Sequence, residues 1–384
     1  MTAPLIFDAH LDLAMNALEW NRDLTQPIDE IRRREAPLRD KPDRGRGTVC
    51  LPEMRRGRIG ICVATQIARV EHHAYSPVFG WASPAQAWAQ TQGQLAWYRA
   101  MEATGQMTPI RDAADLERHL GRWTAVDSRP SGCDPTGGIT GDSIKAPPLD
   151  PPAGELPIGF ILSLEGADSI MTLKHLEDEY AQGLRALGPA HYGPGVYANG
   201  TDATGGFNAR GRELLKEMDR LDLILDVSHL CDDCFGEALD LYHGPMWASH
   251  SNCRALTPHP RQLTDEQLRA LVARDAVVGA ALDAWMLVPG WERGRTTPEA
   301  AGLRLETFVQ HLDHICQIAG NARHAGIGSD LDGAFGREQT PVDVETIADL
   351  GQIPGLLKAR GYTDEHARQI MSGNFLRFLG QALP

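Results

Sequence analysis

The chain has 384 residues, of which 42% are hydrophobic and 23% are charged, a composition typical of soluble globular proteins. Its formal net charge of −14 at pH 7 argues against a nucleic-acid-binding protein, because phosphate contacts need a basic surface. No stretch approaches the roughly 18 consecutive apolar residues of a membrane span, so we expect no membrane partner. No export signal is visible and the seven cysteines are an odd number, so we expect reduced thiols and a cytoplasmic location.

Short apolar segments alternate with longer amphipathic ones, a pattern typical of a parallel α/β architecture. The expected strands are, in chain order, Leu5–His10, Ile59–Ile67, Ile158–Leu164, Leu184–Leu187, Leu223–Val227, Pro245–Ser249, Ala276–Leu282 and His324–Ser329. The helical patterns between them include Pro84–Met101, Ala209–Leu221, Thr264–Arg274 and Pro298–Ala319. These repeats predict one domain over residues 1–384, folded as a (β/α)8 TIM-like barrel.

Two stretches interrupt this alternation. Residues 25–48 are polar and rich in Arg and Pro, and we expect a loop over the mouth of the barrel. Residues 125–157 are crowded with Pro, Gly, Ser and Asp, which predicts a long loop insertion before the third strand. After the eighth strand, the ranges Val342–Arg360 and Asp364–Leu383 are expected to form closing helices.

Polar residues follow several of the expected strands, at the end of a barrel where chemistry takes place. His10 and Asp12 end the first strand, and residues two apart on a strand face the same side. Glu165 leaves the third strand, where a buried carboxylate is costly without a partner. His229 and His250 follow the fifth and sixth strands. Imidazoles and carboxylates converging in this way predict a metal site, with zinc as the expected metal and the number of ions open.

The eighth strand ends in two acidic residues, Asp330 and Asp332, of which either could serve as a proton acceptor. Asp330 comes first off the strand, whereas Asp332 is better suited to capping the turn before Gly333. Trp20 and Trp285 are candidates for pocket walls, although an aromatic residue is more often plain core.

Other motifs are weaker. His311 and His175 also precede a carboxylate by two residues, but both lie in helical patterns, and we interpret them as solvated helix surface. Cys231 and Cys234 have the spacing of a redox pair. A lone CxxC is a weak signal, and the alternative is two thiols in the first turn of a helix.

Six motifs, in order along the chain, resemble the membrane dipeptidase (renal dipeptidase) family of the amidohydrolase superfamily. They are Asp8–Asp12, Ser163–Gly166, Arg185–His191, Ile224–His229, Ser249–Asn252 and Gly326–Gly333. The resemblance implies that His10 and Asp12 bind one zinc ion, that His229 and His250 bind a second, and that Glu165 bridges them.

The resemblance also implies an activity: zinc-dependent cleavage of dipeptides, including some L,D-dipeptides, by a metal-bridging hydroxide. Asp330 is then expected to move the proton, His191 to contact the substrate near the scissile carbonyl, and Arg261 to bind the free carboxylate. A homodimer is expected on the same ground. The segment Ala281–Met286 departs from the Asn- and Tyr/Phe-containing stretch more usual in the family, which leaves the side-chain preference open.

Two rival interpretations stay open. The first is a related metallohydrolase acting on N-acyl amino acids, lactones or other esters, and the second is a non-catalytic metal-binding barrel. Arg261 favours a substrate that ends in a carboxylate, since a guanidinium pairs with it through two hydrogen bonds. The alternative for each residue is that it has no role in substrate binding: Arg261 would then be a surface arginine and His191 a loop histidine.

Overall fold

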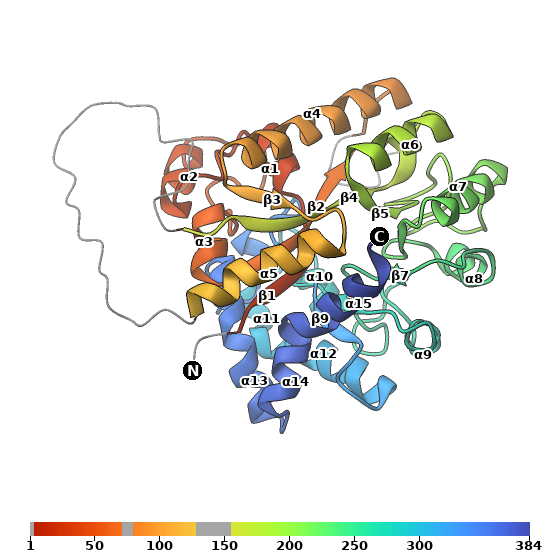
Figure 1. Ribbon diagram of the computed structural model, residues 1–384. Helices are drawn as coiled ribbons and strands as arrows, with labels where there is room; N and C mark the ends of the chain where they lie inside the picture. The colour runs from red at the N-terminus through yellow and green to blue at the C-terminus, as the bar shows by residue number, and fades with distance from the viewer. Residues whose placement is uncertain (1–3, 71–79, 128–154) are drawn as a thin grey trace, which may run out of the picture.

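The computed structural model describes residues 4–70, 80–127 and 155–384, and its centre is a parallel sheet curved into a barrel (Figure 1). The described strands are β1 Ile6–Leu11, β2 Ile59–Ile67, β3 Met107–Pro109, β4 Ile158–Glu165, β5 Leu184–Gly188, β6 Ile224–Asp226, β7 Met246–Trp247, β8 Val278–Ala280 and β9 Ala325–Ile327. Eight of them pair in the order β7-β6-β5-β4-β2-β1-β9-β8. A bridge between Ala248 and Val278 brings the end of β7 to β8 and nearly closes the barrel. The predicted (β/α)8 fold is confirmed.

Helices surround this sheet (Figure 1). They are α1 Leu13–Glu19, α2 Ile28–Glu35, α3 Leu51–Arg56, α4 Pro84–Ala103, α5 Ala113–Asp127, α6 Leu173–Gln182, α7 Ala209–Arg220, α8 Asp232–Leu241, α9 Asp265–Ala273, α10 Ala284–Leu287, α11 Pro298–Ala301, α12 Leu305–Ala319, α13 Ile353–Ala359, α14 Asp364–Arg368 and α15 Asn374–Ala382. Thr264 caps the start of α9, and Gln267 completes a capping box there.

One strand, β3, is not among the eight that the sequence predicts. It pairs with residues 158–160 of β4, and β5 pairs with residues 162–165, so both occupy the same edge of β4 at different heights. Because β3 is only three residues long, its sequence carries no readable alternation.

A register shift in β1 decides which of its side chains face the interior. Asp8 pairs with Cys62 and Leu11 pairs with Ala64, so β1 has one residue more than β2 between these pairs. Such a bulge reverses the alternation of side chains along the strand. Phe7 therefore points into the barrel interior while Leu11 packs in the outer core, and His10 is turned toward the barrel mouth.

The amino-terminal ends of the strands are closed by α15. The ring of Phe375 stacks on Phe7 with 4.9 Å between centroids and contacts Trp247 at 5.8 Å. A Cβ on Gly326 of β9 would lie 2.4 Å from the Phe375 ring, so this close approach requires glycine. The open end of the barrel is therefore the opposite one, where the strands end in polar residues.

Several predicted boundaries were wrong. Pro298–Ala319 forms two helices, α11 and α12, because Gly302 adopts a left-handed conformation (φ 62°) between them. Val342–Arg360 is helical only from residue 347, first as a 3-10 turn and then as α13. Asp364–Leu383 is helical as expected, with a π-helical stretch at residues 369–373.

The two predicted interruptions differ from expectation. Residues 25–48 are not all loop, since they contain α2, which begins after Pro27 with acidic residues in its first turn and arginines in its last. The predicted insertion at 125–157 begins inside α5, and residues 128–154 lie outside the described part of the chain.

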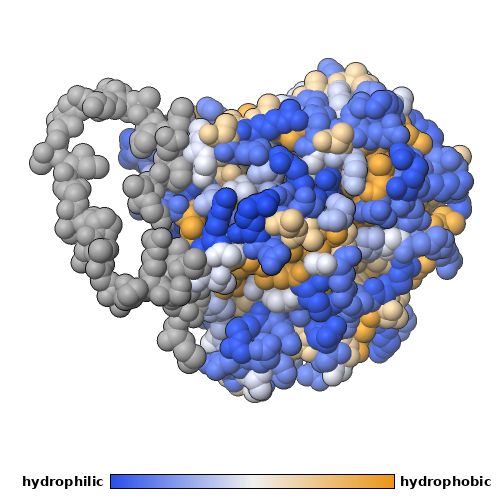
Figure 2. Space-filling view, viewed as in Figure 1, coloured by the Kyte–Doolittle hydropathy of each residue, from blue (hydrophilic) through white to orange (hydrophobic). Residues whose placement is uncertain are grey.

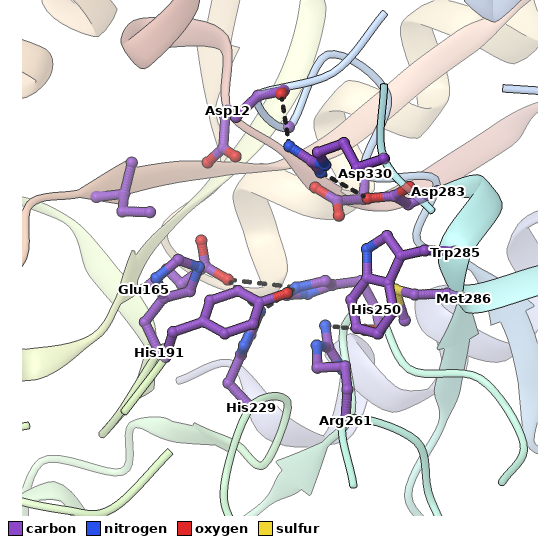
Figure 3. Close-up of a pocket in the computed structure, with 15 residues that line it drawn as sticks. Asp12, Glu165, His191, His229, His250, Arg261, Asp283, Trp285, Met286 and Asp330 are labelled. Atoms are coloured by element: carbon purple, nitrogen blue, oxygen red, sulfur yellow. Dashed lines mark hydrogen bonds and ion pairs between the residues drawn. The ribbon is translucent and has the colours of Figure 1, made fainter. Parts of the chain in front are cut away.

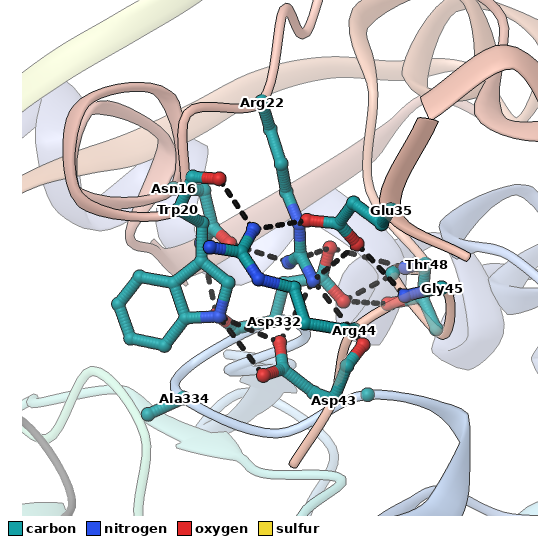
Figure 4. Close-up of polar contacts among 12 residues, drawn as sticks. Asn16, Trp20, Arg22, Glu35, Asp43, Arg44, Gly45, Thr48, Asp332 and Ala334 are labelled. Carbon is teal, nitrogen blue, oxygen red and sulfur yellow. Dashed lines mark hydrogen bonds and ion pairs between the residues drawn. The ribbon is translucent and has the colours of Figure 1, made fainter. Parts of the chain in front are cut away.

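A buried polar network anchors residues 25–48 to the barrel (Figure 4). The Arg22 guanidinium, which is 2% exposed, donates to Glu35 Oε1 at 2.9 Å, Asp43 Oδ2 at 2.8 Å and Asp332 Oδ2 at 3.4 Å. Trp20 Nε1 donates to Asp43 Oδ2 at 2.8 Å. One guanidinium thus contacts three buried carboxylates from separate segments, and Arg44 adds a second positive charge beside Glu35.

Substituting Arg22 with alanine is expected to lower the free energy of unfolding by about 3–5 kcal/mol, because it leaves buried carboxylates unpaired. Arg34→Ala on α2 is the matched control, since Arg34 is 58% exposed and solvent screens its pair with Glu30, so this variant should lose little stability. Urea unfolding of both variants measures the difference, and equal losses would contradict the proposed role of the network.

The outer surface is largely hydrophilic in the view of Figure 2, with smaller hydrophobic areas among the polar residues. Over the described residues, every helix is too short or too polar to cross a membrane.

Candidate metal centre and active site

The carboxyl ends of the barrel strands line a pocket that contains most of the predicted site residues (Figure 3). Its lining residues are Asp12, Ile67, Glu165, His191, Tyr192, His229, His250, Arg261, Asp283, Trp285, Met286, Arg293, Asp330, Gly333 and Ala334. His10 is buried beside them, in contact with Glu165. Side chains that are far apart in the sequence therefore converge at one rim, as expected.

Glu165, the last residue of β4, is the hub of the cluster. Its Oε1 lies 3.3 Å from His229 Nε2 and 3.2 Å from His250 Nε2, and its Oε2 lies 3.6 Å from His10 Nε2. The two oxygens of one carboxylate thus face different histidines. A carboxylate in this position can bridge two cations.

A second group of carboxylates surrounds His10. Its Nε2 lies 3.8 Å from Asp12 Oδ1 and 3.9 Å from Asp330 Oδ1. Asp12 follows β1 directly and Asp330 follows β9, the strand paired with β1. This half of the site therefore depends on the pairing of the first and last strands of the barrel.

The outer nitrogens of two histidines are held by hydroxyl groups. Thr201 Oγ1 lies 3.1 Å from Nδ1 of His229, and Ser249 Oγ lies 2.8 Å from Nδ1 of His250. When these nitrogens carry the proton, the Nε2 atoms present their lone pairs to Glu165 and to each other, 3.1 Å apart. Such partners orient the histidines that bind metals.

The residues present fit a metal centre. His10 Nε2, Asp12 Oδ1 and Glu165 Oε1 are buried and have no hydrogen-bond partner among the described residues. Burying such atoms without compensation is costly, and a cation would satisfy all three. Potential ligand atoms within 4.8 Å of one another form three overlapping sets: His10, Glu165 and His250; Glu165, His191 and His229; His10, Asp12 and Asp330. Nitrogen and oxygen donors of this kind suit zinc, and there are enough for more than one ion.

Burial has the largest influence on the pKa values of the acidic groups. It raises the pKa of Glu165 to about 8, against the influence of the His10 charge. It raises the pKa of Asp330 well above its usual value, and the nearby carboxylates of Asp12 and Glu165 raise it further. Burial thus favours the protonated form of Asp330.

Two buried aspartates that we did not single out as site residues position the strand ends. Asp8 accepts hydrogen bonds from the backbone N–H groups of His10 at 3.2 Å and Ser329 at 2.9 Å, joining β1 to the segment after β9. Asp226 accepts hydrogen bonds from the backbone N–H groups of Ser228 at 3.0 Å and Ser249 at 3.1 Å, joining β6 to the segment after β7. Each lies just before a predicted ligand, which is the signal that could have identified it.

Two residues of the site have strained backbones. His229 and Asp330 have φ values of 66° and 57°, in the left-handed region. This conformation costs free energy for residues with side chains and is enriched at functional sites.

His191 and Arg261 both reach the pocket, as predicted. The ring centroid of His191 lies 4.4 Å from that of His229, and its Nδ1 is buried without a described hydrogen-bond partner. Burial and the nearby arginines lower the pKa of His191 well below its usual value, so its ring is neutral.

Arg261 is 4% exposed and donates to Ser251 Oγ at 3.0 Å and to the His250 carbonyl at 2.6 Å. The interpretation of Arg261 as a surface residue is wrong.

Asp332 does not join the site. Its carboxylate accepts hydrogen bonds from the backbone N–H of Thr48, at 2.8 Å, and of Val49, at 3.0 Å, instead of capping the turn before Gly333. A turn cap was therefore the wrong prediction. Sequence proximity to Asp330 could not reveal these partners, which are more than 280 residues away.

Trp285 lines the pocket as expected, whereas Trp20 is buried behind it against Ile67 and Ala334. The pocket also contains Tyr192, Asp283 and Arg293, which sequence reasoning missed. Asp283 lies within the unusual segment after β8, so its position was a usable signal. Arg293 lies ten residues further on, where the sequence carries no signal.

The structure also places the weaker motifs, namely the two helical histidines and the cysteine pair. His311 is 1% exposed and accepts a hydrogen bond from the Cys253 N–H at 3.1 Å, so the prediction that it is solvated was wrong. His175 is partly exposed on α6, beside Thr172. Cys231 is the N-cap residue of α8 and Cys234 lies in its first turn, and both are free thiols.

The model of the membrane dipeptidase family (peptidase family M19) matches residues 153–383, which is more than half of the chain. The chain belongs to the membrane dipeptidase family. An uncharacterized protein encoded in the pqqA 5′ region of Klebsiella pneumoniae is 34% identical over 214 residues, which cover 54% of this chain and 75% of that protein. An uncharacterized dipeptidase of Schizosaccharomyces pombe is 28% identical over 225 residues, covering 57% of this chain and 52% of its relative.

The fold of this membrane dipeptidase family member also matches solved structures. A metallopeptidase from Rhodobacter sphaeroides, liganded with a phosphinate mimic of the dipeptide L-Ala-D-Ala, aligns with a TM-score of 0.74 and 23% identity. The alignment covers 99% of this chain and 100% of that one. The family thus places the chain among metallopeptidases, in agreement with the clustered metal-ligand donors.

Proposed function

We propose that this chain is a dipeptidase that holds two zinc ions, one bound by His10 and Asp12 and the other by His229 and His250, with Glu165 bridging them. The observation that carries the proposal is the hub at Glu165, whose two oxygens face histidines from different strands at 3.2–3.6 Å. The orphaned, buried donor atoms around it support the same assignment.

Zinc ions bound at this position would supply a nucleophile at neutral pH, since zinc can lower the pKa of a water to about 7. Asp330 then accepts the proton of the attacking water and returns it to the leaving amine. Its burial, which raises its pKa well above the usual value, suits a group that is protonated for part of each cycle.

The remaining polar groups act on the substrate. His191, held neutral by burial, donates a hydrogen bond to the oxygen of the scissile carbonyl as negative charge develops there. Arg261 binds the free carboxylate with its guanidinium, which Ser251 and the His250 carbonyl hold in place. A substrate held by Arg261 thus has its peptide bond directed toward Glu165 and Asp330.

A kinetic panel of L,L- and L,D-dipeptides together with elemental analysis tests the proposal. The ligand of the Rhodobacter sphaeroides protein, a mimic of L-Ala-D-Ala, supports including both stereochemistries. We expect about two zinc ions per chain and hydrolysis of at least part of the panel. Protein that binds two zinc ions but cleaves no dipeptide would favour a non-catalytic metal-binding barrel.

Arg261→Ala is expected to lower kcat/KM for dipeptides by roughly 100-fold or more, because it removes a charged hydrogen-bond partner of the carboxylate. Hydrolysis of a neutral ester such as p-nitrophenyl acetate, which lacks that carboxylate, is expected to fall much less. Equal losses on both substrates would favour a metallohydrolase that does not recognise a terminal carboxylate.

A further inference from the structure

A second cavity adjoins the metal-centre pocket and has no role in the chemistry described above. It has a volume of about 390 Å³, and its walls include Tyr192, His259, Trp285, Trp291 and Arg293. We call this cavity the vestibule. Three of these residues, Tyr192, Trp285 and Arg293, also line the metal-centre pocket, so the two spaces lie side by side.

The metal-centre pocket alone is too small for a dipeptide. Its free volume is about 40 Å³, whereas ligand pockets commonly measure about 300–1,000 Å³. The vestibule falls within that range. A dipeptide whose scissile bond reaches Glu165 therefore extends beyond this pocket, and the vestibule is an adjoining space large enough for a side chain.

The walls of the vestibule are suited to an aromatic group. The rings of His259 and Trp285 meet edge to face, with 4.8 Å between centroids and 77° between planes. Trp285 and Trp291 are both only partly buried and both line the cavity, and Trp291 also packs against the hydrophobic core. Aromatic pairs in this geometry contribute free energy beyond the area that they bury.

The vestibule also shares a chain segment with the carboxylate-binding residue. His259 Nδ1 accepts a hydrogen bond from the backbone N–H of Arg261 at 3.1 Å, and both belong to the stretch after β7. Arg261 also lines the metal-centre pocket together with Trp285, which forms part of the vestibule wall, so a carboxylate bound by Arg261 would lie on the side of the pocket that adjoins the vestibule.

We propose that the vestibule binds the side chain of the carboxyl-terminal residue of the substrate and selects bulky aromatic side chains. This inference rests on the proposed dipeptidase function. It assigns a substrate class, dipeptides with a carboxyl-terminal aromatic residue, to the segment after β8 that carries Trp285 and Trp291.

The first test compares Ala-Trp, Trp-Ala and Ala-Ala as substrates of the zinc-loaded protein. We expect kcat/KM for Ala-Trp to exceed that for Ala-Ala by roughly 10- to 100-fold. Trp291→Ala should reduce this ratio several-fold and Trp291→Phe should largely retain it. Because each ratio is measured on one preparation, partial unfolding of a variant does not alter it. Trp97→Ala, which removes a partly buried tryptophan of α4 outside both cavities, is the matched control and should keep the wild-type ratio.

Three results in this test would overturn the proposal: a ratio near one, a preference for Trp-Ala over Ala-Trp, or a ratio that Trp291→Ala leaves unchanged.

The second test does not need turnover. Calorimetric titration with L-tryptophan and with L-alanine, the carboxyl-terminal products of Ala-Trp and Ala-Ala, measures occupation of the vestibule directly. We expect tryptophan to bind at least tenfold more tightly, and Trp291→Ala to remove the difference. Equal affinities overturn the vestibule proposal even if dipeptides are cleaved. Tighter binding of tryptophan without cleavage of any dipeptide would uphold the vestibule and contradict the hydrolytic function instead.

Discussion

Glu165→Gln is expected to lower kcat/KM for dipeptide cleavage by about a thousandfold or more and to reduce the bound zinc below two ions per chain. Glutamine preserves the size of the side chain but removes the charge and one of the two anionic oxygens. Those oxygens face His229 and His250 on one side and His10 on the other. Without this carboxylate, two cations held in the pocket would repel each other with less compensation.

Glu179→Gln is the matched control for this substitution. Glu179 is also a buried glutamate, 1% exposed on α6, but it bonds to Gln92 and lies outside the pocket. We expect this variant to keep its zinc and its activity. Elemental analysis and the dipeptide assay on both variants make the comparison. Full activity of Glu165→Gln, or equal loss in both, would contradict a bridging role for Glu165.

Asp330→Asn is expected to lower kcat for dipeptides by about 100- to 10,000-fold while zinc stays bound. Asparagine cannot accept and return the proton, whereas the ligands assigned to zinc are unchanged. The dependence of kcat on pH provides a second readout. The change in kcat that follows the protonation of Asp330 in the wild-type protein should disappear in the variant. Retention of that change would assign the proton transfer to another group.

Asp332→Asn separates catalysis from folding at a position two residues away. Asp332 neutralises Arg22 and accepts hydrogen bonds from Thr48 and Val49, so this variant should lose stability by about 1–3 kcal/mol. Its kcat for the fraction that remains folded should change little. Urea unfolding and activity on both aspartate variants distinguish the two roles.

Much of this site could be anticipated because the barrel repeats a simple rule. Several of the expected strands are apolar and are followed directly by polar residues, and parallel strands in a closed barrel all end at one rim. His10, Glu165 and His250 could therefore be placed together from their positions after strands alone. Their order along the chain then matched the motifs of one family.

Other features carried no local signal. The register shift between Asp8 and Leu11 depends on pairing with β2, and it determines that His10 faces the rim. The burial of His311 depends on Cys253, which belongs to a different segment. A helical pattern alone shows neither which face meets the barrel nor which helix covers it.

The sequence by itself determined the alternation of strands and helices, and with it the set of side chains that end the strands, because periodicity and strand-end position are local properties. Only the tertiary structure decided which of two neighbouring aspartates enters the pocket. Asp330 does so while Asp332 binds Thr48, since pairing across more than 280 residues depends on how the closed barrel brings its first and last segments together. The aromatic vestibule was decided in the same way, because its walls come from three separate segments of the chain.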